Sequence, residues 1–396
     1  MIIPKAARLQ HVQEYYFARK LAEVRALAAQ GKKIINLGIG NPDQLPSAAT
    51  VEALHTSAAG SQSHGYQSYT GIPALRQAMA HWYGHTYTVP LTEAEVLPLM
   101  GSKEGIVHIS MAFLNPGDKA LVPNPGYPAY ASATRLAGAE PVSYTLSEEN
   151  GWLPQEEELE RLVQEGGVKL LWINYPHMPT GTEATAHMLE RLVTFAQKHQ
   201  ILLINDNPYS LVLPNQAPLS LLGIPGAKEC CLELNSLSKS HNMAGWRVGM
   251  VLGAPEYLAT ILAVKSNMDS GMFLPVQEAA VEALQNDSAW HAARNEVYGG
   301  RKVLAHQLLD ELKCVYQPDT VGMFVWARVP DTITDVEAYL DEILYEAGVF
   351  ITPGKIFGTQ GERYLRVSLC VAADQLEEAI KRIKHHNLQT IHHELK

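Results

Sequence analysis

The sequence predicts an α/β protein: a large domain with a mostly parallel, doubly wound sheet, plus a smaller α+β domain. Two observations support this prediction. Several short apolar runs end in turn residues and precede helix-like stretches, and these runs are apolar throughout rather than alternating. Unbroken apolar character is typical of strands covered on both faces, as in parallel sheets. At 396 residues the chain also exceeds the usual size of one domain, which favours two.

Six segments show this strand-to-helix pattern. They read EVLPLMGSKEG, KALVPNPGYP, KLLWINYPHMPTG, ILLINDNPYS, ECCLELNSLSKS and RVGMVLGAPEYL. Ligands of doubly wound sheets bind beyond the carboxyl ends of the strands, which is where the polar tails of these segments fall. We therefore expect the functional site among these tails.

The pattern changes after residue 282. A long helical stretch near residues 283–312 is followed by GMFVWARV, a helix near 335–347, VFITPG and RYLRVSLC. Long helices with a few strands predict a small α+β domain over residues 283–396. We expect residues 1–45 to form an N-terminal arm that completes it, and residues 46–282 to form the large domain.

Composition excludes several function classes. A content of 46% hydrophobic and 18% charged residues is typical of ordered globular proteins. The 31 basic and 41 acidic residues give a net charge of −10, which disfavours nucleic acid as a partner. The four cysteines match no zinc spacing, and no run is long and apolar enough for a signal peptide or a membrane span. We expect a cytoplasmic protein with no metal and no membrane partner.

Lys239 and Asp206 follow apolar strands and are the first candidates for chemistry. A lysine at a buried strand end is costly unless it is exposed or has a task, such as forming an imine with a carbonyl cofactor. A carboxylate at Asp206 could cap the next helix, or it could hold a proton on a pyridine nitrogen. Tyr209, three residues further on, could donate to a phenolate oxygen.

The segment GSKEG at residues 101–105 opens a predicted helix after a strand. Free N–H groups there form a phosphate cradle, to which Ser102 adds a hydroxyl and Lys103 at least its amide. Ser236 and Arg247 flank Lys239 at −3 and +8 and could bind the same dianion. Tyr127 could offer its ring to a cofactor, or it could pack in the core.

Together these residues describe a site for pyridoxal 5′-phosphate. The chain resembles the class I/II aminotransferases, which have fold type I and belong to the aspartate-aminotransferase-like superfamily. The resemblance spans nearly the whole chain. It rests on NLGIGNPD, YQSYTGIPALR, GSKEG, PNPGYPAY, DNPY, SLSKSHNMAGWRVG and YLRVSLC.

The resemblance implies a pyridoxal-phosphate-dependent transaminase that exchanges an amino group between an L-amino acid and a 2-oxo acid by a ping-pong mechanism. The catalytic roles fall on Lys239 as the cofactor's imine partner, Asp206 at the pyridinium nitrogen and Tyr209 at O3′. The phosphate would be bound by Ser102, Lys103, Ser236 and Arg247, helped by Tyr66 from the second subunit of a homodimer. Arg366 would bind the substrate α-carboxylate as a bidentate pair, assisted by the backbone at Gly40.

Two questions about function stay open at this stage. Carbon–sulfur β-lyases share the scaffold and are the nearest alternative, and a non-catalytic cofactor-binding protein is a remote one. Tyr15 could line the substrate side-chain pocket, although packing of an amphipathic first helix predicts an aromatic residue there equally well. The segment KSNMDSGMF contains no arginine for a second carboxylate, which disfavours a strict aspartate or glutamate donor.

Met178 departs from the pattern. Related proteins carry Asn-Pro-Thr-Gly here, where the asparagine donates to O3′ and touches the carboxylate-binding arginine; a thioether cannot donate. Because the other matching positions retain suitable chemistry, we expect a working site with one hydrogen bond fewer. Such a bond contributes about 0.5–1.5 kcal/mol, so the imine pKa should rise by roughly one unit or less. His177 or a water molecule could supply the missing donor.

Overall fold

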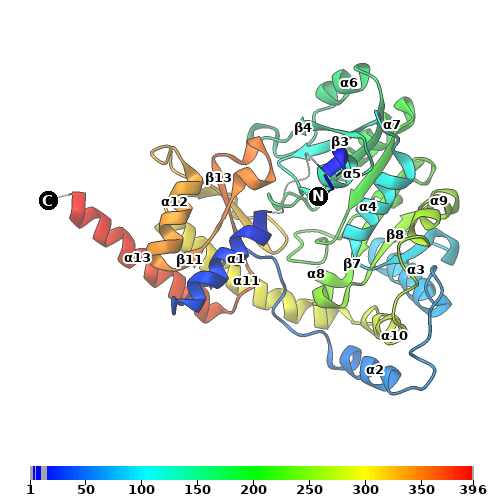
Figure 1. Cartoon of the computed structure of the whole chain (residues 1–396), viewed down its shortest axis with the longest axis horizontal. Coiled ribbons are helices and arrows are strands. Elements are labelled where there is room, and N and C mark those ends of the chain that lie inside the picture. Colours follow the sequence, from blue (N-terminus) through cyan, green and yellow to red (C-terminus); the bar gives the residue numbers. More distant parts are fainter. Residues whose placement is uncertain (1–2, 5, 10–15, 395–396) are drawn as a thin grey trace.

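The computed structural model describes residues 3–4, 6–9 and 16–394. Figure 1 shows a large unit built around one sheet and a smaller unit beside it, from which the last helix, α13 (Ala373–Glu394), extends outward. Within the described residues, no helix is both long enough and apolar enough to cross a membrane.

The large sheet has seven strands, and only one of them runs against the others. Strand β8 pairs antiparallel with both of its neighbours, and every other pairing is parallel. In spatial order the strands are β2 (Val96–Leu99), β8 (Gly249–Gly253), β7 (Cys231–Ser236), β6 (Leu202–Asp206), β5 (Val168–Ile173), β3 (Lys119–Asn124) and β4 (Glu140–Thr145). The predicted mostly parallel α/β sheet is confirmed.

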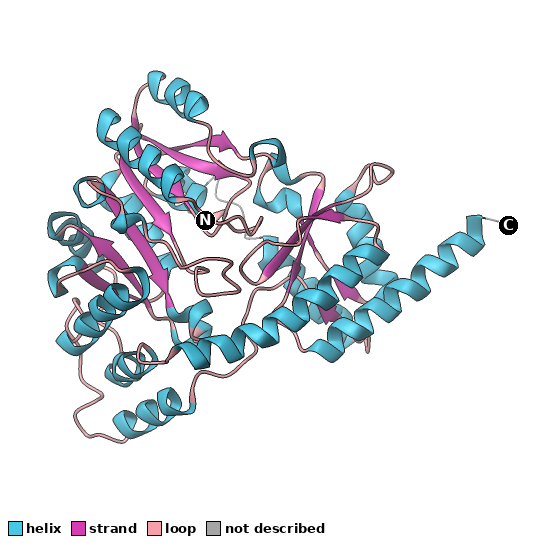
Figure 2. Cartoon of the chain, turned by 180° about the vertical axis from the view of Figure 1, so that it is seen from behind, coloured by secondary structure: helices cyan, strands magenta, loops and turns pink. Residues whose placement is uncertain are grey.

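Helices cover both faces of this sheet (Figure 2). They are α3 (Pro73–Tyr87), α4 (Ser102–Phe113), α5 (Ala129–Leu136), α6 (Glu156–Gln164), α7 (Ala186–His199) and α9 (Pro255–Lys265). Helix α2 (Ala48–Ala58) packs instead on α10 (Leu274–Ala283), which packs on α3. Leu170 and Trp172 belong to one hydrophobic cluster, whereas Leu171 and Ile173 belong to another on the opposite face. Both faces of β5 are therefore buried, which explains its unbroken apolar run.

The smaller unit has a four-stranded antiparallel sheet. Its strands, in spatial order, are β12 (Thr352–Pro353), β13 (Tyr364–Ser368), β10 (Phe324–Arg328) and β9 (Val315–Tyr316). The N-terminal segment joins this unit because β1 (Ile35–Asn36) pairs with β11 (Val349–Phe350), while α1 (Tyr16–Ala29) packs there through Val24 and Leu27. The domain boundaries at residues 45/46 and 282/283 stay a prediction.

Helix α11 (Ser288–Glu311) connects the two units (Figure 2). It starts five residues later than the long helical stretch that the sequence predicts, because the Asp287 side chain caps it by accepting from Trp290 N at 2.8 Å. Arg294 donates to the carbonyl of Ser240 in the large unit, and Arg301 donates to that of Leu369 in the small unit. The small unit also contains α12 (Val336–Glu342).

Candidate active site

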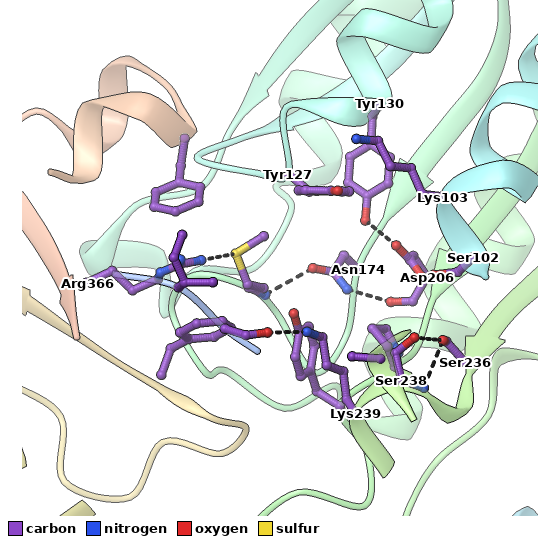
Figure 3. Close-up of a pocket in the computed structure, with 18 of the residues that line it drawn as sticks. Ser102, Lys103, Tyr127, Tyr130, Asn174, Asp206, Ser236, Ser238, Lys239 and Arg366 are labelled. Carbon is purple, nitrogen blue, oxygen red and sulfur yellow. Dashed lines mark hydrogen bonds between the residues drawn. The ribbon is translucent and has the colours of Figure 1, made fainter. Parts of the chain in front are cut away.

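A cavity of about 570 Å³ lies at the carboxyl edge of the large sheet, where the two units meet. Ten of the twelve residues assigned to the site from the sequence line it: Gly40, Ser102, Lys103, Tyr127, Asp206, Tyr209, Ser236, Lys239, Arg247 and Arg366. Figure 3 shows how several of them converge. These ten residues line one cavity, as expected if the polar ends of the strands form a single site.

Of the other two residues, the structure describes only Tyr66. Tyr66 is 92% exposed and does not line the cavity of its own chain. Tyr15 falls outside the described residues, although Leu21 of α1 does reach the cavity.

Lys239 sits on the single-turn helix α8 (Leu237–Ser240), directly after β7. Its ammonium group donates to the carbonyl of Gly40. Burial lowers the pKa of Lys239 to about 8, and the positive charges of Arg366 and Arg247 act in the same direction. A lysine with a lowered pKa supplies the neutral amine that attacks a carbonyl.

Asp206, at the end of β6, is 4% exposed. Its Oδ2 accepts from the Tyr130 hydroxyl at 2.9 Å, and its backbone carbonyl accepts from Asn174 Nδ2 at 2.5 Å. Its Oδ1 is buried and has no hydrogen-bond partner in the part of the chain that the structure describes. Burial raises the pKa of Asp206 to about 7, partly offset by the Tyr130 bond and reinforced by the charge of Glu233.

The Oδ1 atom of Asp206, which has no hydrogen-bond partner among the described residues, shows what kind of group would fit the site. A buried carboxylate oxygen without a donor is costly, and a protonated ring nitrogen would satisfy it. The donor set therefore fits a pyridine ring held against Asp206.

At the start of α4, where the sequence predicts a phosphate cradle, the chain approaches its neighbours so closely that two positions require glycine. A Cβ on Gly101, which has φ of 86°, would lie 2.1 Å from Arg247 Nη2, and a Cβ on Gly249 would lie 2.7 Å from Ser102 N. Arg247 is fixed by bonds to the carbonyls of Ala244 and Met100 at 2.9 and 3.3 Å. Free helical N–H groups beside a guanidinium form an anion site.

Arg366 enters the cavity from β13 and is 4% exposed. Its Cζ lies 3.8 Å from the ring centroid of Phe324 and 4.6 Å from that of Phe357. Nη2 donates to the Gly38 carbonyl at 2.8 Å, and Nη1 donates to Met178 Sδ at 3.2 Å, a contact drawn in Figure 3. Met178 therefore contacts the predicted carboxylate-binding arginine.

His177 does not supply the donor that Met178 lacks. Its Nδ1 lies 2.8 Å from Thr180 Oγ1, and its Nε2 lies 3.2 Å from the Pro125 carbonyl. Burial lowers the pKa of His177 to about 3, so the ring is neutral, with Nε2–H donating to Pro125 and Nδ1 accepting from Thr180. The suggestion that His177 replaces the asparagine donor is wrong because both ring nitrogens are engaged.

Several lining residues were not assigned to the site from the sequence: Leu21, Ile39, Tyr130, Asn174, Pro208, Ser238, Ala244, Phe324 and Phe357. Tyr130 lies inside the motif PNPGYPAY, and Asn174 lies inside the segment KLLWINYPHMPTG, so the sequence contained a signal for both residues. Phe324 and Phe357 come from the small unit, and only packing brings them to Arg366.

One group outside the cavity has metal-ligand chemistry. Ligand atoms of Glu104, His108 and Asp269 lie within 4.8 Å of one another. Lys265 Nζ lies 2.8 Å from Asp269 Oδ2 and already supplies a positive charge there. That no metal is required stays a prediction.

The fold and the site define the class of pyridoxal-phosphate-dependent transferases of fold type I. The chain belongs to the aminotransferase class I and II family, whose sequence profile matches residues 32–383. It is an aminotransferase with pyridoxal phosphate as its cofactor, which confirms the expected activity and cofactor.

Named relatives agree with this assignment. The LL-diaminopimelate aminotransferase of Oleidesulfovibrio alaskensis is 41% identical over 96% of this chain and 98% of its own length. The enzyme of the same name from Aquifex aeolicus is 38% identical over 95% and 97%. The substrate-bound structure of BacF from Bacillus subtilis superposes with a TM-score of 0.92 at 35% identity, covering 98% of both chains.

Proposed function

We propose that this aminotransferase transfers the amino group of an L-amino acid to a 2-oxo acid, with Lys239, Asp206 and Tyr209 as its catalytic residues. The observation that carries the proposal is the buried Oδ1 of Asp206, which lacks a hydrogen-bond partner among the described atoms and belongs to a residue that lines the same cavity as Lys239. Bound pyridoxal phosphate supplies an electron sink for the bond broken at the substrate Cα. Asp206 maintains that sink by holding a proton on the ring nitrogen.

Lys239 has two tasks in this proposal. Its amine would hold the cofactor covalently, and the free amine would act as the base that takes the proton from the substrate Cα and as the acid that returns it. The lowered pKa favours both tasks because the amine is available without its proton near neutral pH. Tyr209 lines the same cavity, where its phenol would donate to O3′.

The remaining polar residues orient the two ligands. The phosphate would be bound at the start of α4 by Ser102, Lys103, Ser236 and Arg247, and the ring would lie against Tyr127; all five residues line the cavity. Arg366 binds the α-carboxylate with the Gly40 backbone beside it, since a planar guanidinium matches a carboxylate in a bidentate pair.

The amino donor that we propose is LL-diaminopimelate. Support comes from the bacterial relatives of that name, which are 38–41% identical over nearly the full length of this chain. A screen of single amino acids against the cofactor-loaded enzyme, read by absorbance, tests this choice. Turnover of another amino acid without turnover of LL-diaminopimelate would reject the donor but keep the aminotransferase.

The role of Lys239 has a test that does not need the substrate. Borohydride reduction of the loaded protein followed by peptide mass mapping should place the cofactor on Lys239, and Lys239→Ala should abolish both the label and turnover. Lys198→Ala, which removes an exposed lysine, is the matched control and should change neither. A label on a different lysine would overturn the assignment.

A homodimer with shared sites and a cytoplasmic location also remain proposals. Tyr66 is 92% exposed, and Met268, Phe273 and Tyr69 are exposed large apolar residues of nearby chain segments at 54%, 47% and 43%. Exposed apolar residues of this size mark interaction surfaces when they gather. Light scattering should give a dimer mass, and Tyr66→Phe should weaken cofactor binding without changing that mass. Cell fractionation tests the location.

A further inference from the structure

We propose that Met178 is a positioning residue for Arg366: its thioether sulfur holds the guanidinium in the orientation that receives the substrate carboxylate. The inference rests on the proposed role of Arg366. It assigns a task to a side chain that the sequence alone presented only as the loss of a hydrogen-bond donor.

The first step concerns what restrains Arg366. The rings of Phe324 and Phe357 lie 3.8 and 4.6 Å from its Cζ. An aromatic ring attracts the cation as a whole and limits its distance from the ring face, but this attraction depends weakly on rotation of the guanidinium about its Cζ. The rings alone therefore leave the direction of the N–H fork open.

Two further contacts fix that direction. Nη2 donates to the Gly38 carbonyl at 2.8 Å, and Nη1 donates to Met178 Sδ at 3.2 Å. Contacts on two different nitrogens fix the orientation of the planar guanidinium, whereas with one contact alone the group could still rotate about that contact. The sulfur thus fixes the guanidinium together with the Gly38 carbonyl.

Met178 is itself held in place by burial and by a backbone hydrogen bond, so it can position Arg366. Its side chain is 6% exposed, and its backbone N donates to Asn174 Oδ1 at 3.0 Å. Asn174 Nδ2 in turn donates to the Asp206 carbonyl at 2.5 Å. This chain of bonds, visible in Figure 3, connects the strand end carrying Asp206 with the small-unit arginine.

The chemistry of sulfur suits this task. A thioether is a weak acceptor, so it orients Nη1 without competing strongly against an incoming carboxylate, which forms the stronger charge-assisted bond. The side chain of Met178 therefore provides an acceptor for the arginine and cannot itself donate a hydrogen bond.

The test measures carboxylate binding separately from turnover. The probe is 2-methylalanine, which carries an α-carboxylate but no Cα hydrogen, titrated into the cofactor-loaded enzyme by absorbance. Met178→Leu removes the sulfur and should raise its Kd about three- to tenfold, the effect of losing one modest hydrogen bond. With a true substrate, KM should rise by a similar factor while kcat changes less than twofold.

Two further variants separate positioning from simple packing. Met178→Asn restores an acceptor and should bring the Kd back to within about twofold of wild type, as expected for one restored bond. Met188→Leu makes the same exchange at a buried methionine of α7 that does not line the cavity, and should leave the Kd unchanged.

The inference is overturned if Met178→Leu binds 2-methylalanine as tightly as Met188→Leu does, or if Asn fails to restore affinity. If Met178→Leu does not fold, Met178→Ile gives a second sulfur-free variant with the same expected rise. If the wild-type enzyme binds 2-methylalanine but turns over no amino acid, the proposed function is rejected and the inference about Met178 is not, because binding of this probe requires no proton transfer.

Discussion

Tyr130 donates its hydroxyl hydrogen to Asp206 Oδ2 at 2.9 Å, and both side chains are almost fully buried. Tyr130 also stacks on Trp172, with ring centroids 5.2 Å apart, so the donor is fixed by the core of the large sheet. The carboxylate at the proposed cofactor site is therefore oriented by the sheet beneath it.

Removing that donor should weaken cofactor binding in a pH-dependent way. The bond lowers the pKa of Asp206, so Tyr130→Phe should raise it above its present value of about 7 and leave more of the carboxyl protonated at neutral pH. We expect the pyridoxal phosphate Kd at pH 7 to rise about tenfold, the effect of one bond to a charged group, and this loss to shrink towards pH 9. Tyr144→Phe, which removes a buried donor to the Trp172 carbonyl, should not alter the Kd.

Asp206 should also destabilise the cofactor-free protein. Its folded pKa of about 7 lies above the ordinary 3.8, so between these values the folded state binds more protons than the unfolded state, and stability falls as pH rises. The cofactor-free Asp206→Asn variant should therefore be more stable than wild type at pH 8 by a few kcal/mol in urea unfolding, roughly the value of a shift of this size. The difference should shrink to about 1 kcal/mol near pH 4.5 and vanish only below about pH 3.8, the ordinary pKa of the unfolded carboxyl. An equal difference at pH 8 and pH 4.5 would contradict the linkage.

Met178→Asn should change the acidity of the lysine–cofactor linkage. An amide donor to O3′ would make that oxygen a poorer acceptor for the protonated nitrogen, so the pKa of the linkage should fall by roughly one unit or less. A spectrophotometric pH titration of the loaded enzyme measures it directly. An unchanged or raised pKa in the variant would count against the missing-donor interpretation.

Glu233 should be essential to the fold beneath the site. It is fully buried and accepts from Tyr83 Oη at 2.9 Å, Leu221 N at 2.8 Å and Asn205 Nδ2 at 3.2 Å. Glu233→Gln would turn an amide hydrogen towards these donors, which should cost about 1–3 kcal/mol of unfolding free energy.

Removing the negative charge of Glu233 should also lower the pKa of Asp206, since that charge now raises it. In a plot of pyridoxal phosphate affinity against pH, the loss of affinity on the acidic side should therefore occur at lower pH in Glu233→Gln than in the wild type. Glu52→Gln on the exposed surface of α2 is the control, and it should change stability by less than about 0.5 kcal/mol. Equal stability of the two variants would show that the buried network contributes nothing.

Much of the site could be predicted because it lies where strands end. Asp206 and Ser236 terminate β6 and β7, and parallel strands deliver their last residues to one edge. Phe324 and Phe357 escaped prediction because a phenylalanine in a strand or turn has the same local pattern whether it packs in a core or against a guanidinium. Tyr130 was overlooked for a similar reason, since a tyrosine inside a helix predicts burial but not its partner.

By itself, the sequence determined the α/β class and the place of the site, because unbroken apolar strands with polar tails leave a local record in the chain. The resemblance of its motifs to known aminotransferases indicated the family and the candidate residues Lys239, Asp206 and Arg366. Only the tertiary structure decided what Met178 contacts and that His177 is already engaged. Arg366 is 188 residues from Met178 in the chain, and no local pattern encodes a contact across that distance. The packing of the small unit against the large one creates this contact, so a thioether that looks like a defect in the sequence becomes an acceptor for a guanidinium.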